Sequence, residues 1–569
     1  MLACSVKRLA FLVLGLQIHH GRAAQPFRTS LTLMDFREQL EKSHGRKAGG
    51  KAVVCARDDV DLSVLYPEHN ISVPVDHFHN DSSYEPHSDG FFNLRYWFDA
   101  SHYKPGGPVI VLQSGETSGE DRLPFLQKGI VAQLAQGTNG IGVILEHRYY
   151  GTSFPVPDLS TDNLRFLTTD QALADQAYFA RNVVFQGLEH LNLTSHKTAY
   201  IAYGGSYAGA FVAFLRKQYP DVYWGAISSS GVTEAIYDYW QYYDAARIYG
   251  PPDCVNATQK LTNVVDNILI GKNDTDYPQQ LKSAFGLGNL TRSDDFANAI
   301  SQGIAGLQST NWDPAENSTD FGFYCGNVSS ADALYPGMER ARPQVRDLIV
   351  AGGYADDQVL VNQMLNYMGY VNATVVASCQ ERNASQDSCF TNYNTTFYET
   401  DDLDGGSWRS WPYQYCTQWG YLQTGSGVPG DQLPLISRLI DLNYTSFVCR
   451  AAFNITEPSD VQAINKYGGF GISYPRLAII DGEKDPWRAA TPHALGQPDR
   501  PNTASEPFIL IKDGVHHWDE NGLLPNETKP GLPPQPVADT QKTELMFVQE
   551  WMMEWALHYS QGTSERWDL

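Results

Sequence analysis

Residues 203–209 read Tyr-Gly-Gly-Ser-Tyr-Ala-Gly, and the interpretation of the chain starts from them. The β-branched and aromatic run at residues 198–203 predicts a strand, and the apolar residues 210–215 predict a helix. A serine flanked by small residues at a strand-to-helix turn is the layout of a nucleophile elbow, which exposes the hydroxyl beside the N–H groups of a helix start. Ser206 is therefore a candidate nucleophile for hydrolysis through an acyl-enzyme.

The motif departs from Gly-x-Ser-x-Gly at one position, since Ala208 stands where the second glycine is usual. Similar strings also arise by chance in a chain with 48 glycines. The flanking strand and helix are the context that the motif requires. The prediction then depends on whether an acid and a base follow downstream.

An acid is available after a predicted strand at residues 477–480, where Asp481 and Asp485 compete for the role. Asp485 lies further into the loop, where its side chain can reach a histidine, and Pro486 favours extended backbone there. We therefore favour Asp485 over Asp481.

The base is expected after a second strand at residues 508–511, which is followed by His516 and His517. The resulting order of serine, acid and histidine is that of α/β-hydrolases. A lone histidine is more often a structural residue, but a pair directly after the expected strand favours catalysis. The spacing alone leaves His516 and His517 as alternatives.

An oxyanion hole needs two backbone N–H groups close to the nucleophile. The N–H of Tyr207, directly after the serine, is the first candidate. The second comes from the loop after an early strand, and residues 113–116 follow the apolar run 108–112. Gly115 in this loop allows close backbone approach, although it reads equally well as a turn glycine.

The order of predicted elements indicates one α/β domain with a large insertion. Strands at 91–98, 108–112, 141–145 and 224–228 alternate with helical segments, which predicts a mostly parallel sheet. The alternation stops after residue 231 and resumes near residue 466. We expect a signal peptide at 1–24, an N-terminal arm or pro-segment at 25–65, the first part of the α/β domain at 66–231, a helical cap insertion at 232–465 and the second part at 466–569.

The charge and the N-terminus point to a secreted protein. The net charge of −23 with no basic stripe argues against nucleic-acid binding. Lys7 and Arg8 precede a short apolar run at residues 9–16, and small residues follow near Ala23, as in a secretory signal. No later run is long enough to span a membrane, so we expect no membrane partner.

Sequons and cysteines agree with an oxidising compartment. The chain carries fourteen Asn-x-Ser/Thr sites, which predict N-linked glycans. Disulfides are expected among the last six cysteines, with Cys55 as the unpaired thiol. No Cys-x-x-Cys pair or zinc-ligand spacing occurs, so neither a metal nor another cofactor is expected. The sequons lie at Asn70, Asn80, Asn192, Asn256, Asn273, Asn289, Asn317, Asn327, Asn372, Asn383, Asn394, Asn443, Asn454 and Asn526.

Taken together, the motifs resemble the S28 family of serine carboxypeptidase-like peptidases, which includes Pro-X carboxypeptidase, dipeptidyl peptidase II and fungal acid prolyl endopeptidases. The resemblance spans about residues 70–555 and points to a fungal-type secreted member. It rests on six stretches, at residues 73–78 (VPVDHF), 146–151 (EHRYYG), 204–209 (GGSYAG), 411–417 (WPYQYCT), 485–487 (DPW) and 514–517 (GVHH).

The resemblance implies an α/β-hydrolase fold with a large, mostly helical, disulfide-bonded cap. It also implies the triad Ser206, Asp485 and His516, because the family uses the first histidine of the pair. It further implies cleavage after proline at acidic pH, with Trp487 and Trp411 helping to line a proline-accepting pocket, although core packing explains these tryptophans equally well. We also expect Glu116 to bind substrate. The stretch at 146–148 is expected to be structural.

The expected function is a secreted serine peptidase acting on peptides with proline at P1, as a Pro-X carboxypeptidase or a dipeptidyl-peptidase-like exopeptidase. A vacuolar or lysosome-like location is the alternative to secretion. The alternatives for function are an acid prolyl endopeptidase, a secreted carboxylesterase on the same fold and a catalytically silent glycosylated binding protein. The sequence leaves open whether the protein forms a homodimer and which peptide terminus is recognised.

Overall fold

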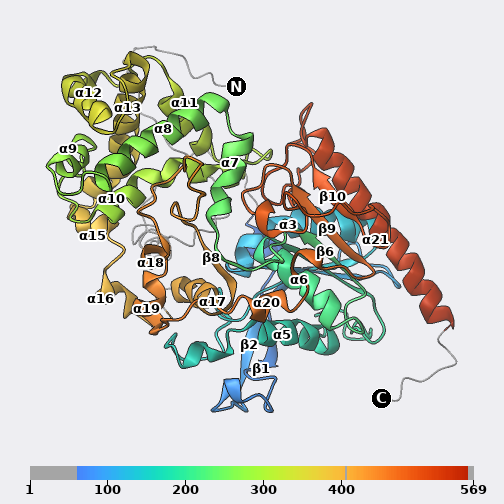
Figure 1. Ribbon diagram of the computed structural model, residues 1–569. Helices are drawn as coiled ribbons and strands as arrows, with labels where there is room; N and C mark the ends of the chain where they lie inside the picture. The colour runs from blue at the N-terminus through green and yellow to red at the C-terminus, as the bar shows by residue number, and fades with distance from the viewer. Residues whose placement is uncertain (1–60, 404–406, 562–569) are drawn as a thin grey trace, which may run out of the picture.

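The computed structural model describes residues 61–403 and 407–561, and its centre is an eight-stranded sheet (Figure 1). The strand order is β1-β2-β4-β3-β5-β6-β9-β10. The pairs β1–β2 and β2–β4 are antiparallel and all the others are parallel. The strands are β1 His69–Pro74, β2 Phe91–Asp99, β3 Val109–Gln113, β4 Ile141–Leu145, β5 Tyr200–Gly205, β6 Gly225–Ser229, β9 Leu477–Gly482 and β10 Phe508–Ile511.

The central strands form where the sequence has short continuous apolar runs. Every residue of β3, β4 and β6 is buried, as expected for parallel strands covered on both faces. The edge strand β1 instead alternates between more and less exposed positions over most of its length. The predicted parallel sheet is thus confirmed, with an antiparallel edge at its N-terminal side.

Helices cover both faces of this sheet, and alternate residues of β3 supply both cores. Val109 and Val111 pack in the cluster formed with α5 and α6, while Ile110 and Leu112 pack in the cluster formed with α4 and α21. In Figure 1, α21 runs along one side of the sheet. These helices are α3 Pro124–Gln127, α4 Ile130–Thr138, α5 Thr169–Asn182, α6 Tyr207–Gln218 and α21 Gln535–Gln561.

The segment between β6 and β9 is mostly helical and carries a small two-stranded sheet. In Figure 1 its helices α8 to α13 gather at one end of the molecule, away from the large sheet. Its elements are β7 Ile236–Asp238, α7 Asp244–Tyr249, α8 Pro252–Leu269, α9 Tyr277–Ala284, α10 Ser293–Ile300, α11 Asp320–Ser329, α12 Arg342–Ala351, α13 Gln358–Val371, α14 Ala377–Glu381, α15 Gln386–Phe390, α16 Thr395–Tyr398, α17 Ser410–Gln414, β8 Gly420–Leu422, α18 Leu442–Thr445, α19 Phe447–Phe453 and α20 Gln462–Asn465.

Three disulfides stabilise this helical segment, and all six downstream cysteines take part. The bonds join Cys254 to Cys325, Cys379 to Cys389 and Cys416 to Cys449. The expected disulfide-bonded helical insertion is therefore present. Cys55, the expected free thiol, lies outside the described residues.

The expected signal peptide and nearly all of the expected N-terminal arm also lie outside the described residues. The last residues of that arm, however, form the short helix α2 (Leu62–Leu65), capped by the Asp61 side chain. Within residues 61–403 and 407–561, no helix is both long and apolar enough to cross a bilayer.

Candidate active site

Ser206 stands at the turn between β5 and α6 with φ 61° and ψ −126°, a strained combination for a residue with a side chain. The N–H of Ser206 donates to the carbonyl of Ser229 at 2.9 Å, which ties the turn to β6. The chain therefore forms the sharp turn that the motif predicts.

Two glycines make this turn possible. A Cβ added to Gly204 would lie 2.2 Å from the carbonyl oxygen of Ala208, and one added to Gly209 would lie 2.7 Å from that of Ser229. The position that departs from the usual motif, Ala208, is fully buried and accommodates its methyl group. The backbone contacts thus require glycine at 204 and 209, and tolerate alanine at 208.

The acid and the base contact each other directly. His516 Nδ1 is 2.8 Å from Asp485 Oδ2, and the backbone N–H of Trp487 donates to Asp485 Oδ1 at 2.8 Å. Both side chains are almost fully buried. The rival acid Asp481 instead lies 2.7 Å from Nδ1 of His493. The geometry therefore supports Asp485 as the partner of His516.

Opposing effects set the pKa values of this pair. Burial would raise the pKa of Asp485, but the His516 charge and hydrogen bonds from His516, Trp487 and Ser230 outweigh it and lower the pKa. Burial lowers the pKa of His516 more than Asp485 raises it. The imidazole thus stays neutral, as a general base must be, further into the acidic range than an exposed histidine.

The second imidazole nitrogen of His516 is buried. Within the described residues, Nε2 has no hydrogen-bond partner. This is the atom that takes the proton of the nucleophile in a serine triad, and apo sites often tighten only when substrate binds.

His517 has a different partner and a different role. Its Nδ1 is 2.8 Å from Glu520 Oε2, and its backbone N–H donates to Ser230 Oγ at 2.9 Å. Burial would lower the pKa of His517, but the Glu520 carboxylate outweighs it and raises the pKa. A histidine that favours the charged form is poorly suited to be the base, which supports His516.

The two expected oxyanion donors differ in availability. Tyr207 begins α6, where an N–H has no partner within the helix. Gly115 has φ 71°, and its N–H donates to Gln113 Oε1 at 2.5 Å. In this structure the Gly115 donor is therefore engaged, and Gln113 must release it before it can bind an oxyanion.

The side chain of Tyr207 links the nucleophile to the helical segment. His147 Nε2 lies 2.9 Å from the Tyr207 hydroxyl, and Gln414 Nε2 donates to the same oxygen at 2.9 Å. The Tyr150 hydroxyl in turn donates to Gln414. Burial lowers the pKa of His147 to about 4, so it is a neutral hydrogen-bonding residue.

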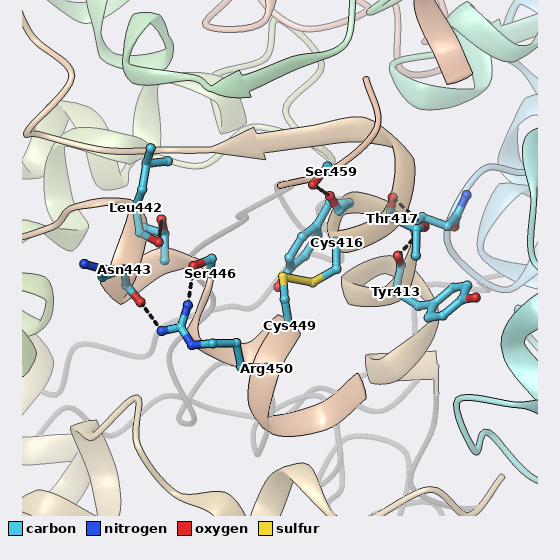
Figure 2. The surroundings of a disulfide bond; sticks show 12 residues. Tyr413, Cys416, Thr417, Leu442, Asn443, Ser446, Cys449, Arg450 and Ser459 are labelled. Atoms are coloured by element: carbon cyan, nitrogen blue, oxygen red, sulfur yellow. Dashed lines mark hydrogen bonds between the residues drawn. A yellow bond between two sulfur atoms is a disulfide. The ribbon is translucent and has the colours of Figure 1, made fainter. Parts of the chain in front are cut away.

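A disulfide holds Gln414 in place. Cys416, two residues further on, is bonded to Cys449 of α19, as Figure 2 shows. The Ser459 hydroxyl donates to the carbonyl of Tyr415 at 2.5 Å, which fastens the same turn from another loop. The neighbours of Ser206 thus depend on contacts well outside the sheet.

The three expected substrate-binding residues lie in different surroundings. Trp411 is buried, with its ring 5.7 Å from that of Tyr207. Trp487 is 1% exposed and its ring stacks on that of Tyr239 at 5.1 Å, so it is a buried core residue next to Asp485 in the sequence. Burial raises the pKa of the half-buried Glu116 to about 8, although Arg122 opposes this shift.

The charged side chains after β4 pair with other buried groups. Glu146 accepts hydrogen bonds from Arg95 and the Gly119 N–H, and Arg148 forms two hydrogen bonds with Asp175. These buried pairs fix the end of β4, from which His147 reaches Tyr207.

Elsewhere, three side chains of the described part could present metal ligands. Potential ligand atoms of Asp76, His79 and His87 lie within 4.8 Å of one another. His87 Nδ1 is already 2.7 Å from Asp76 Oδ2, and the Gln171 side chain also donates to Asp76. This group lies between β1 and β2 and includes none of the triad residues.

Comparisons with known proteins identify the family of the chain. The model of the serine carboxypeptidase S28 family matches residues 74–530. A protein of Arthroderma benhamiae described as a probable extracellular serine carboxypeptidase is 56% identical over 88% of this chain and 70% of its own length. The serine protease vicPa of Bipolaris victoriae is 30% identical, over 75% of this chain and 80% of its own length.

Human thymus-specific serine protease is 26% identical over 77% of this chain and 80% of its own length. Among solved structures, a proline iminopeptidase of Mycobacterium smegmatis covers 85% of this chain and 99% of its own, with a TM-score of 0.33 and 12% identity. The family match spans the elbow, the acid and the histidine pair, and the chain belongs to the serine carboxypeptidase S28 family of serine peptidases.

Proposed function

We propose that this chain is a secreted serine peptidase that hydrolyses the peptide bond after proline in mild acid. The observation that carries the proposal is the buried contact of 2.8 Å between Asp485 and His516, in a chain whose Ser206 is held at a strained turn. The fungal relative described as extracellular supports secretion.

The expected reaction is acyl transfer. Ser206 Oγ attacks the carbonyl carbon of proline while His516 Nε2 takes the hydroxyl proton, and Asp485 stabilises the imidazolium. The N–H of Tyr207, together with one from the loop at Gly115, holds the oxyanion. His516 then gives its proton to the leaving amine as the C–N bond breaks. In deacylation, His516 takes a proton from a water molecule that attacks the ester carbonyl, and then gives it to Ser206 Oγ as the ester C–O bond breaks.

Two features support acidic conditions and proline. Because burial lowers the pKa of His516, the base stays neutral to a lower pH than an exposed histidine. The rings of Trp411 and Trp419 lie 5.7 and 4.9 Å from that of Tyr207, and such an aromatic surrounding suits an apolar proline ring at P1.

The test compares three peptides at about pH 5, where a buried neutral histidine can still act as the base. They are an N-blocked peptide ending in Pro-X, a free-amine X-Pro amide and a blocked peptide with an internal proline. Cleavage after proline by the wild type and none by S206A is expected. Hydrolysis of a short-chain ester with no peptide cleaved would refute the peptidase assignment.

A further inference from the structure

Arg122 places a permanent positive charge at the edge of the candidate active site. It ends a short helix (Gly119–Arg122) after β3, and its Nε donates to the carbonyl of Ser114 at 3.1 Å. A Cβ built on Gly115 would lie 3.9 Å from Arg122 Nη2 and 3.7 Å from the Cβ of Ala208. The guanidinium therefore lies against the oxyanion loop, close to the residues that follow the nucleophile.

The same guanidinium lies near the loop that carries the base. A Cβ built on Gly205 would lie 3.1 Å from Glu520 Oε2 and 3.2 Å from Cγ of His517, so this pair packs beside the nucleophile. The rings of His516 and His517 are 4.4 Å apart. Because His516 delivers the proton to the leaving amine, this is the side on which the departing residue lies.

The other charges here largely cancel in mild acid. His517 and Glu520 form an ion pair, since the pKa of the histidine is raised and that of the carboxyl is lowered. Burial raises the pKa of Glu116 to about 8, so this carboxyl is mostly neutral in mild acid. Burial also raises the pKa of Glu316, which therefore stays neutral to a higher pH than an exposed glutamate. Arg122 adds a guanidinium charge beside these groups. The titratable groups whose charges interact with Arg122 are Glu116, Glu316, His517 and Glu520.

We propose that Arg122 binds the C-terminal α-carboxylate of the substrate, so that the enzyme removes one residue after proline as a carboxypeptidase. An arginine fork matches a carboxylate with two parallel hydrogen bonds. A carboxylate on the departing residue lies only a few bonds from the scissile nitrogen, which places it near the base and the oxyanion loop. This proposal rests on the proposed peptidase function and deepens it.

The test is a matched pair of substrates that differ only at the C-terminus, an N-blocked Pro-Phe acid and its amide. We expect the wild type to prefer the acid, and R122Q to lose about 10- to 100-fold in kcat/KM for the acid, mainly through KM. Turnover of the amide should be little changed, and R122K should restore part of the preference. R181Q, at an exposed ion pair with Asp221, is the matched control and should match the wild type.

Several outcomes would overturn the proposal. An equal loss on acid and amide in R122Q, with an unchanged Tm, would show that Arg122 only supports the loop. Equal wild-type rates on acid and amide, or cleavage of a free-amine X-Pro amide in place of the acid, would assign another terminus while leaving post-proline cleavage intact. Failure of every proline peptide would instead refute the proposed function itself.

Discussion

At the scale of single residues, the central distinction is between neighbours of the same type. Asp481 and Asp485 lie in one loop, yet one pairs with His493 and the other with His516. Asp485 is therefore the carboxylate that orients the base, and Asp481 makes a structural contact. The two carboxylates can therefore be separated experimentally.

We predict that D485N lowers kcat by about 10³- to 10⁴-fold, because the base loses the carboxylate that orients and stabilises it. D481N should keep kcat within about tenfold, since it disturbs only the packing of His493. Steady-state kinetics on a blocked Pro-X peptide measures both, with Tm as the control for folding. A larger loss in D481N than in D485N would reverse the assignment.

The histidine pair gives a second contrast at this scale. H516A should abolish turnover, because it removes the imidazole that Asp485 contacts at 2.8 Å. H517A should retain measurable turnover, since His517 contacts Glu520 and Ser230. Single-turnover rates of the two variants show which histidine is the base. If H517A is inactive and H516A is active, the base is His517 and the assignment is wrong.

At the scale of elements, the β5–α6 turn requires Gly204, because the backbone leaves no space for a side chain at this position. We predict that G204A lowers Tm strongly or prevents folding, because a Cβ would lie 2.2 Å from backbone oxygen. The control is G322A in α11, where a Cβ meets nothing within 4 Å and a helical alanine is favoured by up to about 1 kcal/mol. A G204A protein with wild-type Tm would contradict the described turn.

The turn after α17 gives a further prediction for an element. The double variant C416S/C449S opens a loop whose ends are 33 residues apart in the sequence. Its free energy of unfolding should fall by about 3 to 4 kcal/mol. Activity should fall as well, because the same turn holds Gln414 on Tyr207. The control is C379S/C389S, which opens a loop whose ends are 10 residues apart, and both variants are compared by unfolding free energy and by kcat. Loss of activity only in the control would contradict the link between the Cys416–Cys449 bond and the active site.

At the scale of the whole molecule, a buried acidic pair couples stability to pH. Asp519 accepts the hydroxyls of Ser229 and Tyr203, and burial raises its pKa to about 6. Burial together with Asp519 raises the pKa of Glu544 of α21 well above its usual range. Folding therefore favours the protonated carboxyls.

The direction of the pH effect on stability follows from the raised pKa of Asp519. Stability from Asp519 is fully present below the unfolded pKa of about 3.9 and is lost as the pH rises through about 6, a change of about 3 kcal/mol. We expect E544Q to flatten the decline in unfolding free energy between about pH 4 and 7, relative to wild type. E550Q, at an exposed position of the same helix, should follow the wild-type curve; identical curves for all three would contradict the coupling.

The fold was largely predictable because its central strands are short apolar runs that fit only a buried parallel sheet, as in β3 and β4. The order of Ser206, Asp485 and His516 was predictable for the same reason, since each follows such a strand. The engagement of Gly115 by Gln113 was not, because it depends on one side-chain rotamer. The contacts of Arg122 and Gln414 join segments far apart in the chain, and no local pattern encodes them.

The most direct test of the account is the identity of the residue that forms the covalent intermediate. Mass-spectrometric peptide mapping after reaction with a fluorophosphonate should show one adduct, on Ser206, whose formation slows in H516A and D485N. An adduct on another residue, or undiminished Pro-X cleavage by S206A, would contradict the account.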